Sequence, residues 1–399
     1  TGFRYRSNTL VLNGLDTKGQ YRPKYTDLQT YWTYDLTEKV EIGFLGLYST
    51  NKYGVVPEDR ETEFGSFNQS LRFTSYFEGQ EVTKFETLFG ALNVNVQQTK
   101  NLRLKFTASA FSTRESERFD VLSEYFLDEL ERDPGSSQFG EAIANLGIGR
   151  SLRHARNDLD ARVLTFAHKG YLQKGKSYIQ WGADVRSELI NDRLSEWTLI
   201  DSAEFSVPVN SGDDLELNYA LKSKLNLASI RASGYLQNTW RWDMGGDKWV
   251  SFIAGARAQY WTYSSQTVVS PRIRLTYHPG WKALSNEGDT LDRDFSFWFA
   301  SGLYYQPPFY REVRGFDGTL NPDIKAQRSI HFVLGMDRRF TIWDRPFKFT
   351  AEGYYKLMNQ LIPYELDNVR IRYYGANLAK GFATGIDLKL NGEFIDGVE

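Results

Sequence analysis

The chain contains no cysteine, which excludes disulfide frameworks, thiolate metal ligands and cysteine nucleophiles. Its 48 basic and 50 acidic residues nearly cancel, so it lacks the basic excess that a nucleic-acid-binding protein carries. No run approaches the roughly 18 apolar residues that mark a membrane-spanning helix. These absences leave a near-neutral chain whose apolar residues are dispersed rather than grouped.

Catalytic signatures are also missing from the sequence. The four histidines (His154, His168, His278 and His331) are scattered and lack the HExxH spacing of a zinc site. There is no GxSxG nucleophile elbow, no phosphate-binding glycine-rich loop and no EF-hand pattern. We therefore predict no enzyme activity, no catalytic residue, no metal and no cofactor.

What the sequence has is aromatic residues and a strict alternation. It holds 27 Phe, 24 Tyr and 10 Trp, although its mean hydropathy of -0.49 is polar. Between Leu102 and Ala110 every even position is apolar and every odd one polar. Period-two alternation of this kind predicts β-strands with one apolar and one polar face.

Similar segments recur through the chain and predict about fourteen strands, most of them near the length of about 9–11 residues that crosses a bilayer when tilted. The predicted strands cover residues 5–13, 27–35, 40–50, 83–98, 102–112, 156–169, 176–189, 230–242, 248–262, 267–278, 293–306, 328–340, 347–361 and 379–391.

The predicted connections alternate in length. Those on one side are mostly short turns, and the interleaved set is long: 51–82, 113–155, 190–229, 307–327 and 362–378. Two connections break the rule, 264–266 and 279–292. Short turns on one side and long loops on the other are typical of outer-membrane barrels. Within the long loop 113–155, the helical spacing of Phe119, Leu122, Phe126 and Leu130 predicts one short amphipathic helix.

These patterns predict an all-β, antiparallel, up-and-down transmembrane barrel in contact with outer-membrane lipid, because a sheet in hydrocarbon must close to pair its backbone groups. Residues 1–399 form a barrel segment: both ends look like interruptions of a larger protein, which favours a barrel of about 22 strands. Charged residues on the polar face would line the lumen: Arg103, Lys105, Arg257, Arg272, Arg274, Lys348, Glu352, Asp387 and Lys389.

An aromatic segment leaves the strand that ends near residue 306. Its two prolines, Pro307 and Pro308, prevent further ladder pairing. The rings around them would surround the outer mouth and could stack on a ligand, although packing at the rim is the alternative. The candidate ligand-binding residues are Tyr304, Tyr305, Phe309 and Tyr310.

Several segments resemble the barrel region of TonB-dependent receptors. They include Ser270–Arg272, the aromatic segment Tyr304–Glu312, and the element Asn321-Pro322-Asp323-Ile324-Lys325 with Ser329. The chain is most similar to Bacteroidota-type receptors with a carboxypeptidase-like regulatory domain. That similarity rests on Arg60–Gly65, Phe85–Leu92, Tyr125–Leu130, Leu194–Trp197 and Trp343–Thr350.

The resemblance implies an outer-membrane receptor-transporter that takes up a scarce nutrient with TonB-coupled energy. It further implies a plug domain, which this chain lacks together with the final strands, a TonB contact made through that plug, and a possible surface lipoprotein partner. The alternatives are a passive porin-like or structural scaffold barrel, and an outer-membrane hydrolase, for which no Ser/His/acid constellation is found. The ligand stays open among siderophore, cobalamin, oligosaccharide, peptide and metal.

Overall fold

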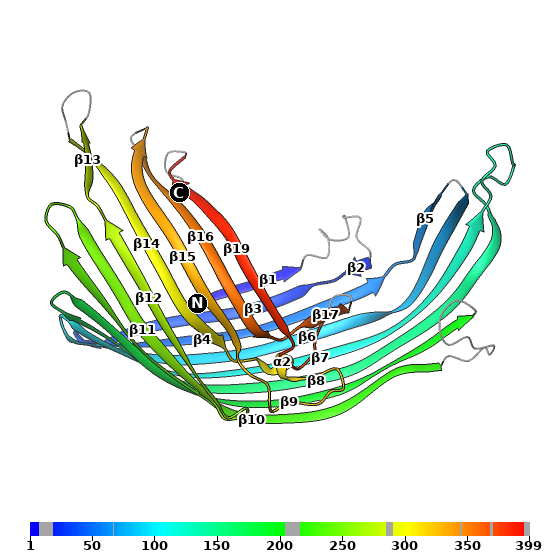
Figure 1. The fold of residues 1–399 in the computed structure, drawn as a ribbon. Helices are drawn as coiled ribbons and strands as arrows, with labels where there is room; N and C mark the ends of the chain where they lie inside the picture. The colour runs from blue at the N-terminus through cyan, green and yellow to red at the C-terminus, as the bar shows by residue number, and fades with distance from the viewer. Residues whose placement is uncertain are drawn as a thin grey trace.

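The structure, a computed structural model, describes residues 1–7, 19–66, 68–203, 216–284, 290–343, 345–367 and 370–394. Almost all of this chain is β-strand, and one large antiparallel sheet bends into a trough (Figure 1). The long strands follow one another up and down, each paired with the next in sequence. This is the pattern that an amphipathic, turn-connected chain produces.

The fourteen principal strands, called the long strands although the described part of the edge strand β1 has only six residues, are β1 (Gly2–Ser7), β3 (Lys24–Thr37), β4 (Val40–Pro57), β6 (Gln69–Thr99), β7 (Leu102–Leu130), β8 (Ala142–Lys174), β9 (Ser177–Ala203), β10 (Glu216–Asp243), β11 (Trp249–Trp261), β12 (Gln266–His278), β14 (Thr290–Gln306), β15 (Gln327–Ile342), β16 (Arg345–Leu361) and β19 (Ala379–Gly392). Three short strands extend this ladder: β2 (Gly19–Tyr21), β5 (Arg60–Ser66) and β13 (Trp281–Leu284).

The fourteen predicted strands correspond one to one with the long strands of the ladder. The prediction for residues 5–13 lies partly outside the described residues, since the structure describes this strand as Gly2–Ser7. Pairing runs from β1–β3 at one end to β16–β19 at the other. Within the described ranges no pairing joins β1 to β19, so the sheet has two free edges.

The short helix predicted at residues 119–130 is wrong. These residues continue β7, which pairs with β6 on one side and β8 on the other. Leu122, Phe126 and Leu130 recur every four residues, a spacing that keeps them on one face of a strand as well as of a helix. Here two neighbouring strands pair the backbone groups that a helix would have paired internally.

The long loops predicted at 51–82, 113–155 and 190–229 are also largely strand. The ladder runs through most of them, and β6 reaches 31 residues and β8 33 residues. At about 3.3 Å per residue, β6 is about 100 Å long. The sheet therefore extends well past the length that spans a bilayer.

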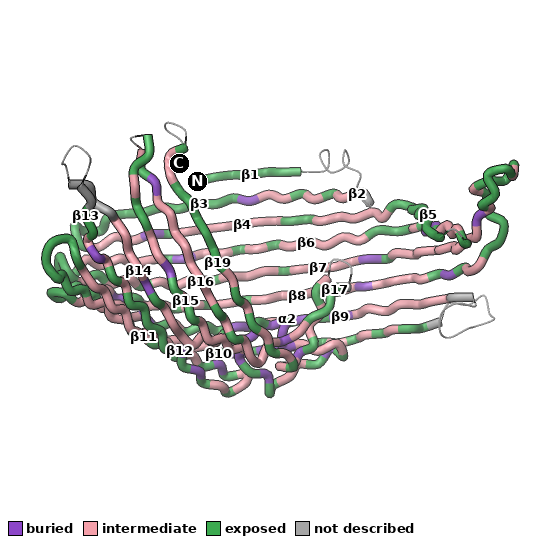
Figure 2. The backbone as a smooth tube through the Cα atoms, turned by 45° about the horizontal axis from the view of Figure 1, so that its top comes forward, coloured by how far each residue is buried: buried purple, intermediate pink, exposed green. Residues whose placement is uncertain are grey.

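The two faces of the sheet differ in chemistry. Phe166, Leu334 and Ile386 belong to one face and are 68%, 66% and 76% exposed. The register places the charged residues predicted to line the lumen on the other face, as where Glu352 lies opposite Asp387. Figure 2 shows exposed and half-buried residues along almost every strand, with buried residues few and dispersed.

In the described part of the chain, α2 (Tyr310–Val313) is the helix of the fold and has four residues. No helix described here has the length and apolar character needed to cross a membrane.

Candidate functional site

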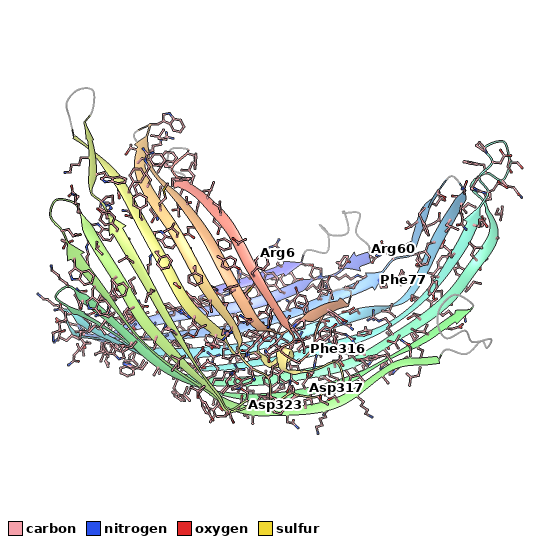
Figure 3. The ribbon with its side chains drawn as sticks, viewed as in Figure 1. Arg6, Arg60, Phe77, Phe316, Asp317 and Asp323 are labelled. Atoms are coloured by element: carbon pink, nitrogen blue, oxygen red, sulfur yellow. The ribbon has the colours of Figure 1, made fainter. Side chains whose placement is uncertain are left out.

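Two connections between long strands fold back into the hollow of the trough (Figure 1). We call residues 307–326, between β14 and β15, the α2 segment. The second connection lies between β16 and β19 and contains the hairpin β17 (Tyr364–Asp367) and β18 (Arg370–Tyr373). Figure 3 labels Phe316, Asp317 and Asp323 of the α2 segment, which lie over the floor of the hollow.

A small apolar cluster holds the two connections together. It consists of Trp261, Val313, Ile324 and Ile362, which are 3%, 0%, 1% and 5% exposed. Tyr263, Leu320 and Tyr373 pack around it. Because these residues come from β11, the α2 segment and the start of the hairpin connection, their burial fixes both connections against the same end of the sheet.

The Asn-Pro element contributes hydrogen bonds to this arrangement. The Nδ2 of Asn321 donates to the carbonyl of Gly375 at 2.8 Å. Asn377, in the other connection, makes a second hydrogen bond: its Oδ1 accepts from the backbone N–H of Lys325 at 2.8 Å. Gly375 has a φ of +66° and backbone atoms of Gly315 lie 2.7 Å from where a Cβ would be, so only glycine fits there.

Arginines of the α2 segment bind carboxylates on the inner face of the sheet. The Nη2 of Arg311 lies 2.6 Å from both carboxylate oxygens of Glu115 on β7. The Nη1 of Arg314 lies 2.5 Å from Asp192 on β9, and Tyr310 donates its hydroxyl to the same carboxylate at 2.8 Å. Asp192 is 4% exposed, so these two donors compensate for the burial of its carboxylate.

The hairpin makes a parallel set of contacts. Arg370 pairs with Glu117 at 2.8 Å and with Glu81 at 3.5 Å. Arg372 pairs with Glu196 at 3.1 Å. The arginine side chains thus extend from β18 to β6, β7 and β9.

Asn157 of β8 connects the two carboxylates that receive these arginines. Its Nδ2 donates to Glu117 at 2.7 Å and to Glu196 at 2.6 Å, while its Oδ1 accepts from the backbone N–H of Ser195 at 3.1 Å. Asn157 is 8% exposed. Each of these residues has at least one polar partner, although the Nη1 of Arg370 is buried without one. Such a network holds its geometry, because a displacement leaves further charge unsatisfied.

A third attachment lies at the start of the α2 segment. Arg231 of β10 pairs with Glu188 at 2.9 Å and donates to the carbonyl of Pro308 at 2.7 Å. Its guanidinium also lies 3.8 Å from the ring centroid of Trp261, a cation–π contact.

The burial of these groups is reflected in their titration. Burial, reinforced by the neighbouring Asp192, raises the pKa of Tyr310 well above its ordinary value, so its hydroxyl stays a donor. Burial also raises the pKa of Glu312, although hydrogen bonds from the Phe309 N–H and from Gln327 act in the opposite direction.

A cavity of about 780 Å³ lies between these connections and strands β3, β4, β6, β7, β8 and β9. Its wall combines the arginines and carboxylates described above with five aromatic rings: Tyr25, Tyr53, Phe85, Phe309 and Tyr373. Aromatic surface with a few placed polar groups is the usual lining of a small-ligand site.

The four predicted site residues have different positions. Phe309 lines the cavity, is 45% exposed and packs edge-on against Tyr373 with ring centroids 5.5 Å apart. Tyr310 is 9% exposed and binds Asp192. The ring of Tyr304 stacks on His331 at 4.3 Å, and the backbone N–H of Tyr305 donates to Ser270 at 3.4 Å. Thus the structure brings Phe309 and Tyr310 to the inner site and keeps Tyr304 and Tyr305 on β14.

Sequence reasoning did not identify the carboxylates or the arginines of this network. Arg311 and Glu115 are 196 residues apart in sequence, and Arg372 and Glu196 are 176 apart. The available signal was the alternation of Glu115 and Glu117 along β7, which places both on one face, but no pattern shows what they meet. The described residues include no group of three or more His, Cys, Asp or Glu side chains arranged to hold a metal ion.

A long antiparallel sheet, apolar on its outer face and charged on its inner face, with connections folded into its hollow, has the construction of a membrane β-barrel wall. The chain belongs to the family described as TonB dependent receptor-like, beta-barrel, whose model matches residues 4–397. Proteins of this family are outer-membrane transporters of Gram-negative bacteria rather than enzymes. A search of curated proteins gives no match.

Solved structures of the same kind are similar to this chain. The structure of the RagAB peptide transporter is 12% identical, with a TM-score of 0.46 over 96% of this chain and 47% of that one. The ferric enterobactin receptor PfeA of Pseudomonas aeruginosa is 12% identical, with a TM-score of 0.46 over 99% and 60%. The copper transporter OprC is 10% identical, with a TM-score of 0.40 over 94% and 59%. The chain spans about half the length of these proteins.

Proposed function

We propose that the full protein is an outer-membrane receptor-transporter that takes up a scarce nutrient with energy coupled through TonB. The observation that carries this proposal is the division of one sheet into an apolar outer face and an inner face of arginine–carboxylate pairs, within a chain that matches the family from residue 4 to 397. A charge on the lipid-facing side would cost about 2–4 kcal/mol at mid-membrane.

In this proposal the ladder is part of a closed barrel of about 22 strands, and a plug domain fills the lumen. The end with the long strands β6–β9 faces the outside of the cell, and the short turns face the periplasm. TonB acts through the plug. The further proposals, that the receptor carries a carboxypeptidase-like regulatory domain of the Bacteroidota type and works with a surface lipoprotein, rest on the resemblance of its motifs.

The ligand is proposed to enter the cavity between the α2 segment, the hairpin and the inner wall. Of the predicted mouth residues, Phe309 offers an exposed ring inside the cavity, and Tyr310 holds the wall beneath it. Tyr304 remains a proposed contact for a ligand passing along the inner face of β14, and Tyr305, which lies on the opposite face, a proposed contact at the outer mouth. Stacking between rings suits a flat or sugar-like ligand, while the charged wall orients its polar groups.

Electrical conductance of the full-length protein in planar bilayers tests the proposal against a passive barrel. A plugged receptor is expected to conduct almost no ions, whereas an open porin-like barrel conducts steadily. Steady conductance with the plug present would favour the passive reading, and a protein that stays in the aqueous fraction without detergent would exclude both.

Uptake by cells tests the energy coupling. Radiolabelled ferric siderophore, cobalamin, an oligosaccharide mixture and a peptide mixture are supplied to cells with and without the gene. Accumulation of one of them that requires the gene, and that stops when a proton uncoupler is added, supports the proposal. Accumulation that is unchanged by the uncoupler contradicts it.

A further inference from the structure

Three lysines on adjacent strands lie directly opposite one another. Lys24 of β3 is paired in register with Lys52 of β4, and Lys52 with Lys84 of β6. All three are exposed. Residues opposed across an antiparallel pair have Cβ atoms about 4.5–5.5 Å apart, and like charges in that arrangement destabilise the sheet. We call these residues the lysine row.

The repulsion in the lysine row is not relieved by a carboxylate. No carboxylate oxygen of the described residues lies within 4.0 Å of any of these three ammonium groups. Glu86, on the same face, accepts the hydroxyl of Tyr48 at 3.2 Å and lies opposite Arg114. A bound anion would therefore reduce a repulsion that is built into the sheet.

The same row continues across the sheet with further cations. Lys84 is opposite Ser116, which is opposite Asp158, and Asp158 is opposite Arg193. Arg193 is in turn opposite Lys224, and both are exposed. The carboxylate of Asp158 is occupied by Arg118 at 2.5 Å. The three residues of the lysine row, together with Arg193 and Lys224, border one hollow of about 770 Å³.

The lysine row lies on the outer face, just beyond its apolar band. Leu28, Tyr48 and Leu88 form the last apolar row on these strands and are 46%, 42% and 59% exposed. Each lysine is four residues further along its strand, which is about 13 Å. At a strand tilt of about 45° this becomes about 9 Å along the membrane normal.

That position lies at the outer edge of the lipid headgroups. The hydrocarbon core is about 30 Å thick and the whole bilayer about 40–45 Å, so each headgroup layer extends only several ångströms beyond the core. Lysine side chains also bend their ammonium groups toward the polar layer while their methylenes stay on apolar surface. From that edge the flexible side chains can bring the ammonium groups to the level of the phosphates of the leaflet next to the long strands.

We propose that the lysine row is a binding site for the phosphate groups of anionic membrane lipids in that leaflet. This inference rests on the membrane placement proposed above. A lipid phosphate would neutralise the opposed lysines, which no carboxylate of the described sheet does. The apolar band beneath them would contact the acyl chains of the same lipid.

The test uses the full-length protein purified in neutral detergent and titrated with phosphatidylglycerol or phosphatidylcholine of identical acyl chains, with bound lipid counted by native mass spectrometry. The variant K24Q/K52Q/K84Q is compared with K39Q/K100Q/K174Q, which removes the same charge from exposed lysines at the short turns at the opposite end of the strands. Thermal unfolding confirms that both variants fold.

Wild type and the turn variant are expected to prefer phosphatidylglycerol, and K24Q/K52Q/K84Q to lose on the order of 100-fold in affinity for it. The preference should weaken as salt is raised. Equal affinity of the two triple variants overturns the proposal, as does equal binding of the two lipids by wild type. Displacement of the lipid by millimolar inorganic phosphate would reassign the row to a soluble anion and also overturn it. Recovery of the wild type in the outer-membrane fraction would show that the proposed membrane location holds, so that a negative lipid result would count against the lysine row alone.

Discussion

Arg314 and Asp192 are 122 residues apart in sequence, yet the guanidinium of one lies 2.5 Å from the carboxylate of the other. Asp192 is 4% exposed on the inner wall, and Arg314 follows α2 in the connection that folds into the hollow. This contact places the α2 segment against β9.

Replacing Asp192 with Asn is expected to loosen the α2 segment without unfolding the sheet. Arg314 would keep a partly buried charge with no carboxylate, which costs on the order of 1–3 kcal/mol. Hydrogen exchange should rise in residues 307–326 and stay unchanged in the short turns. D243N is the matched control, since Asp243 pairs with Arg241 through two well-exposed side chains and such pairs contribute little. Equal exchange in the two variants would contradict the role given to Asp192.

Replacing Asn157 with Ala should free the hairpin. Both Glu117 and Glu196 lose a hydrogen bond, and the arginines of β18 depend on those carboxylates. We expect a loss of about 1–3 kcal/mol and faster exchange at 370–373. N157D should be more damaging, because it places a third carboxylate between two others. A hairpin equally protected in all three proteins would show that Asn157 does not organise the network.

Titration of Glu312 should make the α2 segment less stable as the pH rises. Burial raises its pKa above the ordinary 4.5, so the folded segment holds the proton more tightly than the unfolded one. Stability is therefore full below pH 4.5 and falls as the pH passes upward through the raised pKa. Hydrogen exchange of residues 307–326, converted to opening free energies at each pH, measures the trend, and E312Q should flatten it.

Asp317, in the same segment, provides a control of opposite sign. Hydrogen bonds from the backbone N–H and hydroxyl of Thr319 lower its pKa below 3.8. Its contribution is present above that value and lost as the pH falls through the lowered pKa. D317N should remove only the loss of segment stability at low pH. A change in the stability at higher pH would show that the effects of Asp317 and Glu312 are coupled.

Replacing Ile324 with Ala should cost about 2–5 kcal/mol, the range for truncating a fully buried aliphatic side chain. Ile324 is 1% exposed in the cluster with Trp261. Limited proteolysis should then cut both connections, since the cluster holds both. F309A is the comparison: its ring is 45% exposed, so ligand affinity should fall while protease resistance is retained. Loss of resistance in F309A would assign Phe309 to packing instead of ligand contact.

The sequence predicted the ladder well because alternation is a local property. Residues 102–112 show it within one strand, and the register with β6 and β8 follows from burying one face. The prediction failed where a helical and a strand pattern coincide. The segment from Phe119 to Leu130 fits a helix as well as a strand, and only the neighbouring strands decide between them. The long extensions of β6 to β9 were missed because residues 51–82, 113–155 and 190–229 were predicted as long loops.

The inner network was beyond local reasoning for a different reason. More than half the chain separates Arg370 from Glu117 in sequence, and in the sequence each looks like an ordinary charged residue of a strand or loop. The aromatic segment at residues 304–310 did mark the right connection, but its rings divide between packing and cavity. The division depends on which rings the folded-back connection carries inward.

The folded-back connections also set the width of the hollow. Both leave strands in the β14–β19 half of the sheet, and their arginines end on β6, β7 and β9 in the other half. The two halves cannot move apart unless these ion pairs separate together. High salt should thus widen the trough, whereas an isolated loop would merely become more mobile.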